Sequence, residues 1–430
     1  MRQFFLGYTI CNDIQNTDGG DCMNAQGILA KASELQPQLQ SIRRDLHQHP
    51  ELGFDLTYTK EFVKNELLKM GYKPILCGKA GLVVLVGGKK PGKTILLRAD
   101  MDALALKEEA DIDFKSQYEG KMHGCGHDMH TAMLLGAAKI LKEHENEIRG
   151  TVKLVFQPAE EIFQGANDMI QAGVLENPDV DAALMIHVMA GLPMSSGSVL
   201  VPGGGISMAS CEQYHIHVRG KGGHGSAPHI AIDPITAAAH IHIALQEINS
   251  RELAGGEFGV FTTCHFDAGK TSNVIPDDAD MWGTIRTIDP DGKIGGQIKE
   301  RMTEITESVA KAYRCEALVE FYDYCPCMVI DESLADAALK YMNELLGQGA
   351  VSMKAIGMDK PAGGSEDFAF VSHKVPTVSM FLAAGNEQEG YIYSQHNPKV
   401  RFDDSVLFKG SAAYAYAALR WLREFEFSHL

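Results

Sequence analysis

Apolar positions along the first 200 residues follow two alternating patterns. Nearly every residue is apolar in 81–88 and 93–100, and again in 151–157 and 182–188, which predicts strands covered on both faces. Helical periodicity precedes these runs over 26–49 and 59–70 and lies between them over 127–145 and 165–173. This alternation predicts an α/β domain whose mixed β-sheet is covered by helices.

The pattern changes near Ser210. An alternating strand at 211–220 is followed by a helix, two strands near 257–266 and 278–287, a second helix and a last strand at 316–324. That β-α-β-β-α-β order predicts a ferredoxin-like α+β unit. The first style resumes with a helix at 332–347, a strand at 376–384 and a helix at 404–425. We therefore predict an extension over 1–25, a discontinuous catalytic domain over 26–209 and 326–430, and an inserted domain over 210–325.

Composition narrows the class of protein. The 430 residues are 45% hydrophobic and 22% charged, and no apolar run approaches the ~20 residues of a membrane span, so disordered and transmembrane classes are excluded. A net charge of -17 disfavours nucleic acid and anionic membranes as partners. Nine cysteines, an odd number, indicate thiols in a reducing compartment, and Phe4–Cys11 makes a poor signal peptide, so we expect a cytoplasmic protein.

One segment matches a nucleotide-binding motif, but the residues that follow it do not fit such a site. Gly87 to Thr94 satisfies the phosphate-loop pattern G-x-x-x-x-G-K-S/T and follows a predicted strand. A phosphate loop also needs a helix directly after it, whose N-terminal amides hold the phosphate. Here the strand ILLRAD follows, so we interpret the segment as a hairpin turn.

Potential metal ligands stand at the ends of the predicted strands, where open α/β sheets place their sites, and Cys125 and His127 lie in a glycine-rich turn at a helix start. Thiolate, imidazole and carboxylate together suit zinc and are tolerable for manganese or nickel. Taken singly, each has a structural reading, as a small buried thiol, a core histidine or a solvated helix start. The residues are Asp100, Asp102, Cys125, His127, Glu160, Glu161 and His187.

Ordered motifs across about 28–425 resemble the dinuclear metal amidohydrolases and metallopeptidases that include hippurate hydrolases, N-acyl-amino-acid deacylases and plant indoleacetyl-amino-acid hydrolases. The motifs are RRDLHQHPELGF (43–54), RADMDAL (98–104), MHGCGHDMHT (122–131), QPAEE (157–161), HV (187–188), GKGGHGSAPH (220–229), SNVIP (272–276), GTIRT (283–287), GGSEDF (363–368) and HNPKV (396–400).

The resemblance implies a role for each matching position. Two divalent ions, of Zn, Mn, Ni or Co, are expected in each subunit, with Glu160 as general base. The inserted domain would mediate homodimerisation, and His224 would reach the neighbouring subunit's site. Asn273, Arg286 and Gly363 would contact the substrate. The implied metal ligands are Cys125, His127, Glu161, His187 and His396.

The chain departs from the family at two places. Ala105 stands where relatives usually have proline, which should be harmless. Ile162, Phe163 and Gln164 stand where many relatives have glycines, and these bulky residues are expected to reshape the substrate pocket.

The expected chemistry explains these residue types. Two divalent ions about 3.5 to 4 Å apart can share a water, lower its pKa and polarise the attacked carbonyl. Glu160 would accept a proton from this water, which becomes a hydroxide that bridges the two ions. It would then deliver the proton to the leaving nitrogen. The positive centre would attract an anionic substrate, whose carboxylate Arg286 could hold. The alternative for Arg286 is a surface ion pair.

The remaining candidates are assigned structural roles. Asp100 and Asp102 are expected to orient ligand histidines from outside the metal shell. His47 and His49 would complement the dipole at a helix end. The other pairs, expected to have no ligand role, are His215 with His217, His240 with His242, and Cys325 with Cys327.

We therefore predict a homodimeric two-metal amidohydrolase. It would cleave the amide bond of N-acyl amino acids or related aryl or acyl conjugates, without nucleic-acid or membrane partners. One alternative is a metal-binding relative without catalytic activity, although the general base and all five ligands are present. The other alternative is a phosphate-loop nucleotide-binding protein.

Overall fold

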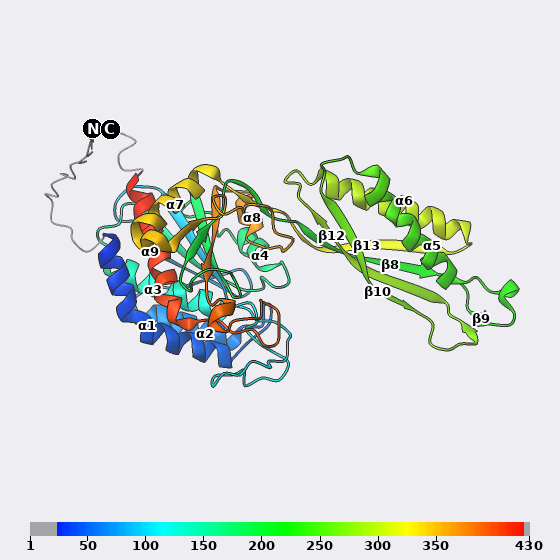
Figure 1. Ribbon diagram of the computed structural model, residues 1–430, viewed down its shortest axis with the longest axis horizontal. Helices are drawn as coiled ribbons and strands as arrows, with labels where there is room; N and C mark the ends of the chain where they lie inside the picture. The colour runs from blue at the N-terminus through cyan, green and yellow to red at the C-terminus, as the bar shows by residue number, and fades with distance from the viewer. Residues whose placement is uncertain (1–23, 425–430) are drawn as a thin grey trace, which may run out of the picture.

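An eight-stranded mixed sheet forms the centre of the larger of two bodies in the computed structural model, which describes residues 24–424 (Figure 1). The strand order is β1-β2-β4-β3-β5-β16-β6-β15. Neighbours β4, β3, β5 and β16 run parallel, so their carboxyl ends share one edge. The strands are β1 (Ile75–Cys77), β2 (Gly81–Gly87), β3 (Thr94–Asp100), β4 (Thr151–Gln157), β5 (Ala182–Met189), β6 (Val199–Val201), β15 (Ala350–Ser352) and β16 (Thr377–Ala383).

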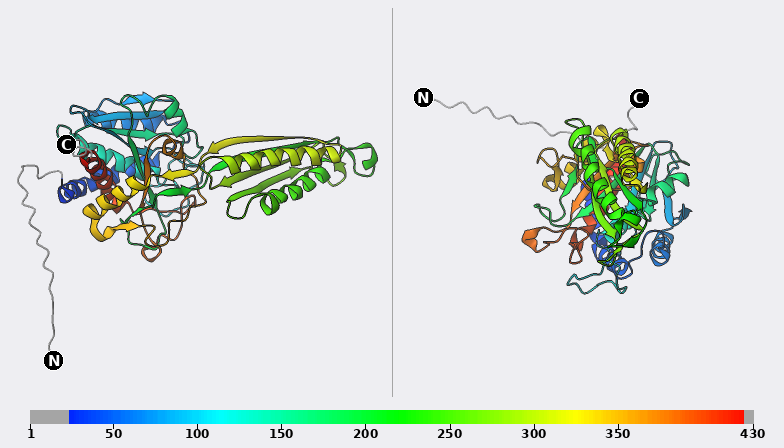
Figure 2. Two further views of the ribbon diagram at one scale, coloured as in Figure 1. Left: turned by 90° about the horizontal axis from the view of Figure 1, so that it is seen from above. Right: turned by 90° about the vertical axis from the view of Figure 1, so that its right-hand side faces the viewer.

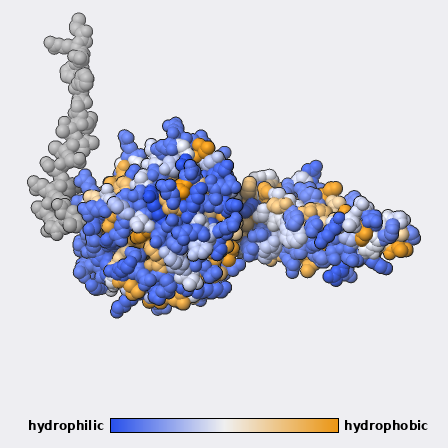
Figure 3. Space-filling model, turned by 90° about the horizontal axis from the view of Figure 1, so that it is seen from below, coloured by the Kyte–Doolittle hydropathy of each residue, from blue (hydrophilic) through white to orange (hydrophobic). Residues whose placement is uncertain are grey.

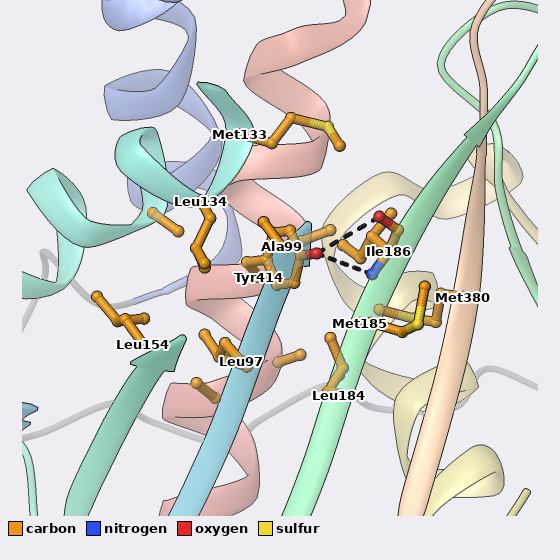
Figure 4. Packing of buried hydrophobic residues seen from close by; sticks show 14 of the residues in the cluster. Leu97, Ala99, Met133, Leu134, Leu154, Leu184, Met185, Ile186, Met380 and Tyr414 are labelled. Atoms are coloured by element: carbon orange, nitrogen blue, oxygen red, sulfur yellow. Dashed lines mark hydrogen bonds between the residues drawn. The ribbon is translucent and has the colours of Figure 1, made fainter. Parts of the chain in front are cut away.

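Helices cover this sheet and bury its apolar strands. Helices α1 (Ala25–Gln48), α3 (His127–Glu143) and α9 (Leu407–Glu424) pack on one another, and α3 and α9 lie against β3. Figure 4 shows the hydroxyl of Tyr414 of α9 pointing at the main chain of Ile186 in β5, whose amide donates to it. The same hydroxyl donates to the carbonyl of Arg98 in β3. The other helices of this body are α2 (Thr57–Lys69), α4 (Gly165–Gln171), α7 (Glu332–Leu346) and α8 (Ala369–Ser372).

The smaller body is built on a four-stranded antiparallel sheet of order β10-β12-β8-β13. Its chain order, β8-α5-β10-β12-α6-β13, is the one expected from the sequence, and its buried residues form a cluster of their own. The elements are β8 (Cys211–Arg219), α5 (Pro234–Glu247), β10 (Gly259–Ala268), β12 (Asp278–Thr287), α6 (Lys293–Ala312) and β13 (Glu316–Cys325). That this body is a separate dimerisation domain stays a prediction.

Two small sheets lie at opposite ends of the smaller body. Strands β7 (Gly205–Met208) and β14 (Met328–Ile330) pair where the chain passes between the bodies. Strands β9 (Gly223–His224) and β11 (Val274–Ile275) pair at the tip far from the large sheet, as Figures 1 and 2 show. Short helical turns complete the structure: Pro228–Ile230, Ile248–Glu252, Gly347–Gly349, Glu387–Glu389 and Asp404–Val406.

The segment Gly87 to Thr94 is not the hairpin predicted from the sequence. Strand β4 lies between β2 and β3, pairing antiparallel with the first and parallel with the second. A helix does not follow Thr94, because β3 begins there. The segment therefore lacks the helix N-terminus that a phosphate loop requires.

Three other sequence predictions concern the N-terminal extension, membrane-spanning helices and the cysteines. The extension predicted over 1–25 lies outside the described residues except for its last two. Among residues 24–424, no helix is long and apolar enough to cross a membrane. The cysteines described are free thiols: Cys77, Cys125, Cys211, Cys264, Cys315, Cys325 and Cys327.

Candidate active site

The polar residues singled out in the sequence meet at the carboxyl edge of the parallel strands. Asp100 ends β3, His187 lies near the end of β5, and Glu160 follows β4 by three residues. Parallel strands side by side bring such residues together because their carboxyl ends share one edge of the sheet. This edge therefore carries the candidate site.

The start of α3 contributes Cys125 and His127. Gly126 between them has a φ of +93°, a conformation that favours glycine. A Cβ at this position would lie 2.4 Å from Cγ2 of Val188. The glycine thus allows α3 to begin directly against β5, which places the flanking thiol and imidazole beside His187.

His127 has one ring nitrogen occupied and the other available. Its Nδ1 donates to the main-chain carbonyl of Asp102 over 2.9 Å. Its Nε2 is buried without a hydrogen-bond partner and lies 3.9 Å from Glu160 and 3.8 Å from Glu161. A buried nitrogen lone pair surrounded by carboxylate oxygens fits a metal ligand.

His187 is oriented in the same way. Its Nδ1 donates to the carbonyl of Val188 over 2.7 Å, and its Nε2 lies 3.5 Å from the Sγ of Cys125. Nε2 of His396 lies 3.6 Å from Oε2 of Glu161. Oε1 of Glu161 is a further buried atom without a hydrogen-bond partner.

These side chains form overlapping groups whose ligand atoms lie within 4.8 Å of one another. Two of these groups share Cys125, and two share Glu161. The donor set of one thiol, three imidazoles and carboxylates suits zinc and related divalent ions. The groups are Cys125–His127–His187, Cys125–Glu161–His396 and His127–Glu160–Glu161.

The two glutamates are held in a buried, acidic environment. Burial, together with the carboxylates of Glu366 and Glu161, raises the pKa of Glu160 well above its usual value. Burial also raises the pKa of Glu161 to about 7. The carboxylate of Asp102 accepts from the main-chain N–H groups of both glutamates, over 3.0 and 3.2 Å, and so fixes the turn that carries them.

Sequence reasoning missed two partners of Asp100. Its carboxylate lies 2.6 Å from His130 and 2.6 Å from Arg98. His130 accepts from the amide of Val188, so its other nitrogen carries the proton donated to Asp100. The signal available was Arg98 itself, a charged residue inside an otherwise apolar strand. In the structure Arg98 also binds Glu366, over 2.8 Å.

A cavity of about 670 Å³ opens on this cluster and extends between the two bodies. Arg286 of β12 reaches it, held by a 2.5 Å hydrogen bond to Ser365. Phe163, one of the bulky residues expected to reshape the pocket, lines it. Much of the remaining wall is apolar and comes from Met189, Leu192, Leu200, Met208, Met353, Met358 and Phe381.

Three expected substrate or catalytic contacts do not line this cavity. His224 and Asn273 lie together at the far tip, where Val274 pairs with His224 and Gly225 donates to the carbonyl of Asn273. Gly363 lies outside the lining, although the next residue, Gly364, belongs to it. Within one chain the tip is remote from the cluster (Figure 1).

His47 lies in the last turn of α1, as expected, and the structure shows which residues it contacts. It is buried, with Nδ1 at 2.8 Å from Asp128 and Nε2 at 3.1 Å from Glu108. It therefore also belongs to a buried polar network with Asp128 of α3 and Glu108.

Comparison with known proteins gives a single family. The sequence profile described as "Peptidase family M20/M25/M40" matches residues 96–420. Thermostable carboxypeptidase 2 of Saccharolobus solfataricus is 37% identical over 395 residues, covering 90% of this chain and 96% of that protein. Hippurate hydrolase of Campylobacter jejuni is 35% identical over 397 residues, covering 92% and 100%.

A solved structure gives the same result. A dinuclear metal-binding peptidase of family M20 from Bacillus subtilis superposes with a TM-score of 0.74 at 31% identity. The match covers 91% of this chain and 99% of that one.

Proposed function

The chain belongs to peptidase family M20/M25/M40 and is a hydrolase, and on that basis we propose that it cleaves the amide bond of N-acyl amino acids or related acyl and aryl conjugates. The observation that carries this proposal is the convergence of five potential metal ligands and Glu160 at one end of an apolar cavity that also contains Arg286.

The site would hold two divalent ions through Cys125, His127, Glu161, His187 and His396. The unpartnered buried atoms of His127 and Glu161 support this assignment, since a buried polar atom is otherwise costly. Bound divalent ions of this kind acidify water and polarise carbonyl groups. Asp100 and Asp102 would keep the ligands in place, through His130 and through the turn at Glu160 and Glu161.

Glu160 would move the proton. It is buried, it borders the cavity, and its main chain is fixed by Asp102. In hydrolysis it would accept a proton from the attacking water and return it to the leaving nitrogen, so that a free amino acid and a carboxylic acid result.

The cavity suggests which parts of the substrate go where. Arg286 would hold a carboxylate, because its guanidinium is a paired donor. The methionine and leucine side chains of the wall would receive the apolar acyl or aryl group, with Phe163 limiting its size. Relatives named hippurate hydrolase, N-acetylcysteine deacetylase and IAA-amino acid hydrolase support this substrate class.

The tip residues require a second subunit in this account. His224 and Asn273 are close to each other but remote from their own cluster, so they would serve the site of a partner in a homodimer. Exposed apolar residues on the smaller body, visible in Figure 3, support such an interface; Ile230, Ile243 and Val274 are 65%, 66% and 54% exposed. Residues 210–325 would then be the dimerisation domain of a cytoplasmic enzyme, and Gly363 would contact the substrate beside Gly364.

A substrate screen tests the proposal. The enzyme reconstituted with divalent metal would be offered acetyl, benzoyl and indoleacetyl conjugates of several amino acids, and amine release would be measured. We expect turnover of at least one conjugate and a rise in KM in Arg286→Ala. Absence of amine release from every conjugate by fully metal-loaded protein would contradict the proposal.

A further inference from the structure

A second cluster of potential metal ligands lies in the smaller body, on the face of its sheet opposite the helices. Tyr214, Ile216 and Val218 of β8 are buried in the core beneath the helices. Because side chains alternate along a strand, His215 and His217 lie on the other face. Strand β12 pairs Asp280 directly with His217.

The structure adds what the sequence could not show. A single oxygen, Oδ1 of Asp280, lies 2.8 Å from Nε2 of His215 and 2.8 Å from Nδ1 of His217. Ligands of one ion with bonds of about 2.1 Å lie roughly 3.0 to 3.4 Å apart. The two oxygen–nitrogen distances are therefore only a few tenths of an ångström shorter than one ion would impose, and all three ligand atoms lie within 4.8 Å of one another.

Each imidazole also has a carboxylate near its other nitrogen. Nδ1 of His215 lies 3.6 Å from Glu320, and Nε2 of His217 lies 3.3 Å from Asp278. Histidines that bind metal usually donate their far N–H to such a group, which fixes the tautomer and increases the basicity of the ligand.

The ring of His215 is further fixed by stacking. It lies parallel to the indole of Trp282, with ring centroids 4.7 Å apart and an interplanar angle of 2°. His265 stacks on the indole with a centroid distance of 4.6 Å. The orientation of the potential ligand is thus set by Trp282 of β12, whereas His265 of β10 contacts the indole and not His215.

The local charge also favours a cation. Asp278, Asp280 and Glu320 lie around the two imidazoles, and the basic side chain of Arg219 is 3.9 Å from Asp278. The three side chains His215, His217 and Asp280 are 22%, 31% and 25% exposed, so an ion from solution can reach them and keep water ligands.

We propose that His215, His217 and Asp280 form a binding site for a divalent transition-metal ion, separate from the active site. Two imidazoles and one carboxylate suit Zn²⁺, Ni²⁺, Co²⁺ or Cu²⁺. In the metal-bound form each imidazole would carry its remaining proton on the far nitrogen, which lies near Glu320 in His215 and near Asp278 in His217. The ion would link β8 to β12 across the open face of the sheet.

Tryptophan emission reports on this site directly. The chain has two tryptophans, and Trp282 stacks on a proposed ligand. Ni²⁺ would be titrated into full-length protein whose active site is already loaded with Zn²⁺. Bound Ni²⁺ quenches a neighbouring indole, so we expect saturable quenching that added Zn²⁺, which does not quench, reverses.

Variants decide whether the proposed ligands are responsible. Asp280→Asn and His217→Gln should each reduce the apparent affinity for Ni²⁺ at least tenfold, while the matched control His265→Gln, on the other side of the indole, should keep it. Circular dichroism would confirm that the variants are folded. Quenching that is absent in the wild type, or equal in all four proteins, would overturn the proposal. Loss of quenching in the control alone would place the ion elsewhere and would also overturn it.

Discussion

The main-chain carbonyl of Asp102 accepts a hydrogen bond from Nδ1 of His127 over 2.9 Å, which directs the other ring nitrogen toward Glu160 and Glu161. The carboxylate of Asp102 binds the amides of these same two glutamates. One residue therefore fixes both an expected ligand and the turn that carries the expected base, although it lines no part of the cavity.

Asp102→Ala should lower metal affinity and turnover together. The variant leaves two buried amides without an acceptor and frees the Glu160–Glu161 turn. Loss of such a supporting group typically costs about 10- to 100-fold in affinity or activity. Metal content at buffered free metal and kcat would be measured, with the exposed Asp111→Ala as control. Unchanged values in both measurements would show that the turn does not need Asp102.

Glu160→Ala and Glu161→Ala should separate proton transfer from metal binding. The first should lose on the order of 10² to 10⁴ in turnover and keep its metal, since general base catalysis contributes about that much. The second should lose metal as well. Elemental analysis and kinetics of both variants give the answer. A Glu160→Ala enzyme with nearly wild-type kcat would disprove the assigned roles.

The buried ion pair between Arg43 and Asp128 should be important for stability. Its atoms lie 2.7 Å apart and both side chains are inaccessible. Burial alone would raise the pKa of Asp128, but the charge of Arg43 holds this pKa well below its usual value. Removing one partner of such a pair typically costs about 3 to 5 kcal/mol, so Asp128→Asn should lower the free energy of unfolding by about that amount.

Urea unfolding at several pH values tests this prediction. A lowered pKa in the folded state stabilises the protein above the unfolded-state pKa of about 3.9, and this stabilisation is lost as pH falls through and below that value. The difference in the free energy of unfolding between wild type and Asp128→Asn should therefore become smaller in acid. Lys31→Ala, which breaks an exposed pair with Glu143, should cost about 1 kcal/mol or less. Equal losses in the two variants would contradict the account.

Mixed dimers test whether His224 acts in the partner's site. Each of His224→Ala and Glu160→Ala should be nearly inactive alone. If His224 acts in trans, a mixed dimer has one intact site, and co-refolding equal amounts should restore roughly a quarter of wild-type activity by random pairing. Native mass spectrometry would confirm that mixed dimers form. An inactive mixture that contains them would reject the shared site.

Patterning predicted the long elements well because each buries one face or is buried entirely. Strand β3 is buried along its whole length, as its apolar run from Ile95 to Leu97 indicates. Strands β6 and β15 were not predicted. They are three residues each, too short for any periodicity, and pair only because residues 199 and 350 meet in the fold.

The site was predicted as a set of residues but not as a geometry. Sequence order cannot show that Asp102 supports Glu160 through main-chain amides, or that His130 lies against Asp100, because these contacts join segments 30 to 58 residues apart. His47 shows the same limit. Its place in the last turn of a helix was predicted, but its partners Asp128 and Glu108 could not be, because they lie 81 and 61 residues further along the chain.

The most direct test of the account is activity without and with metal. Protein stripped by chelation, and shown by elemental analysis to be metal-free, should hydrolyse no acyl-amino acid, since the residues of the site need bound ions to activate water. Adding Zn, Mn, Ni or Co should restore amine release in proportion to the metal bound by Cys125, His127, Glu161, His187 and His396. Undiminished hydrolysis by the metal-free protein would contradict the central claim.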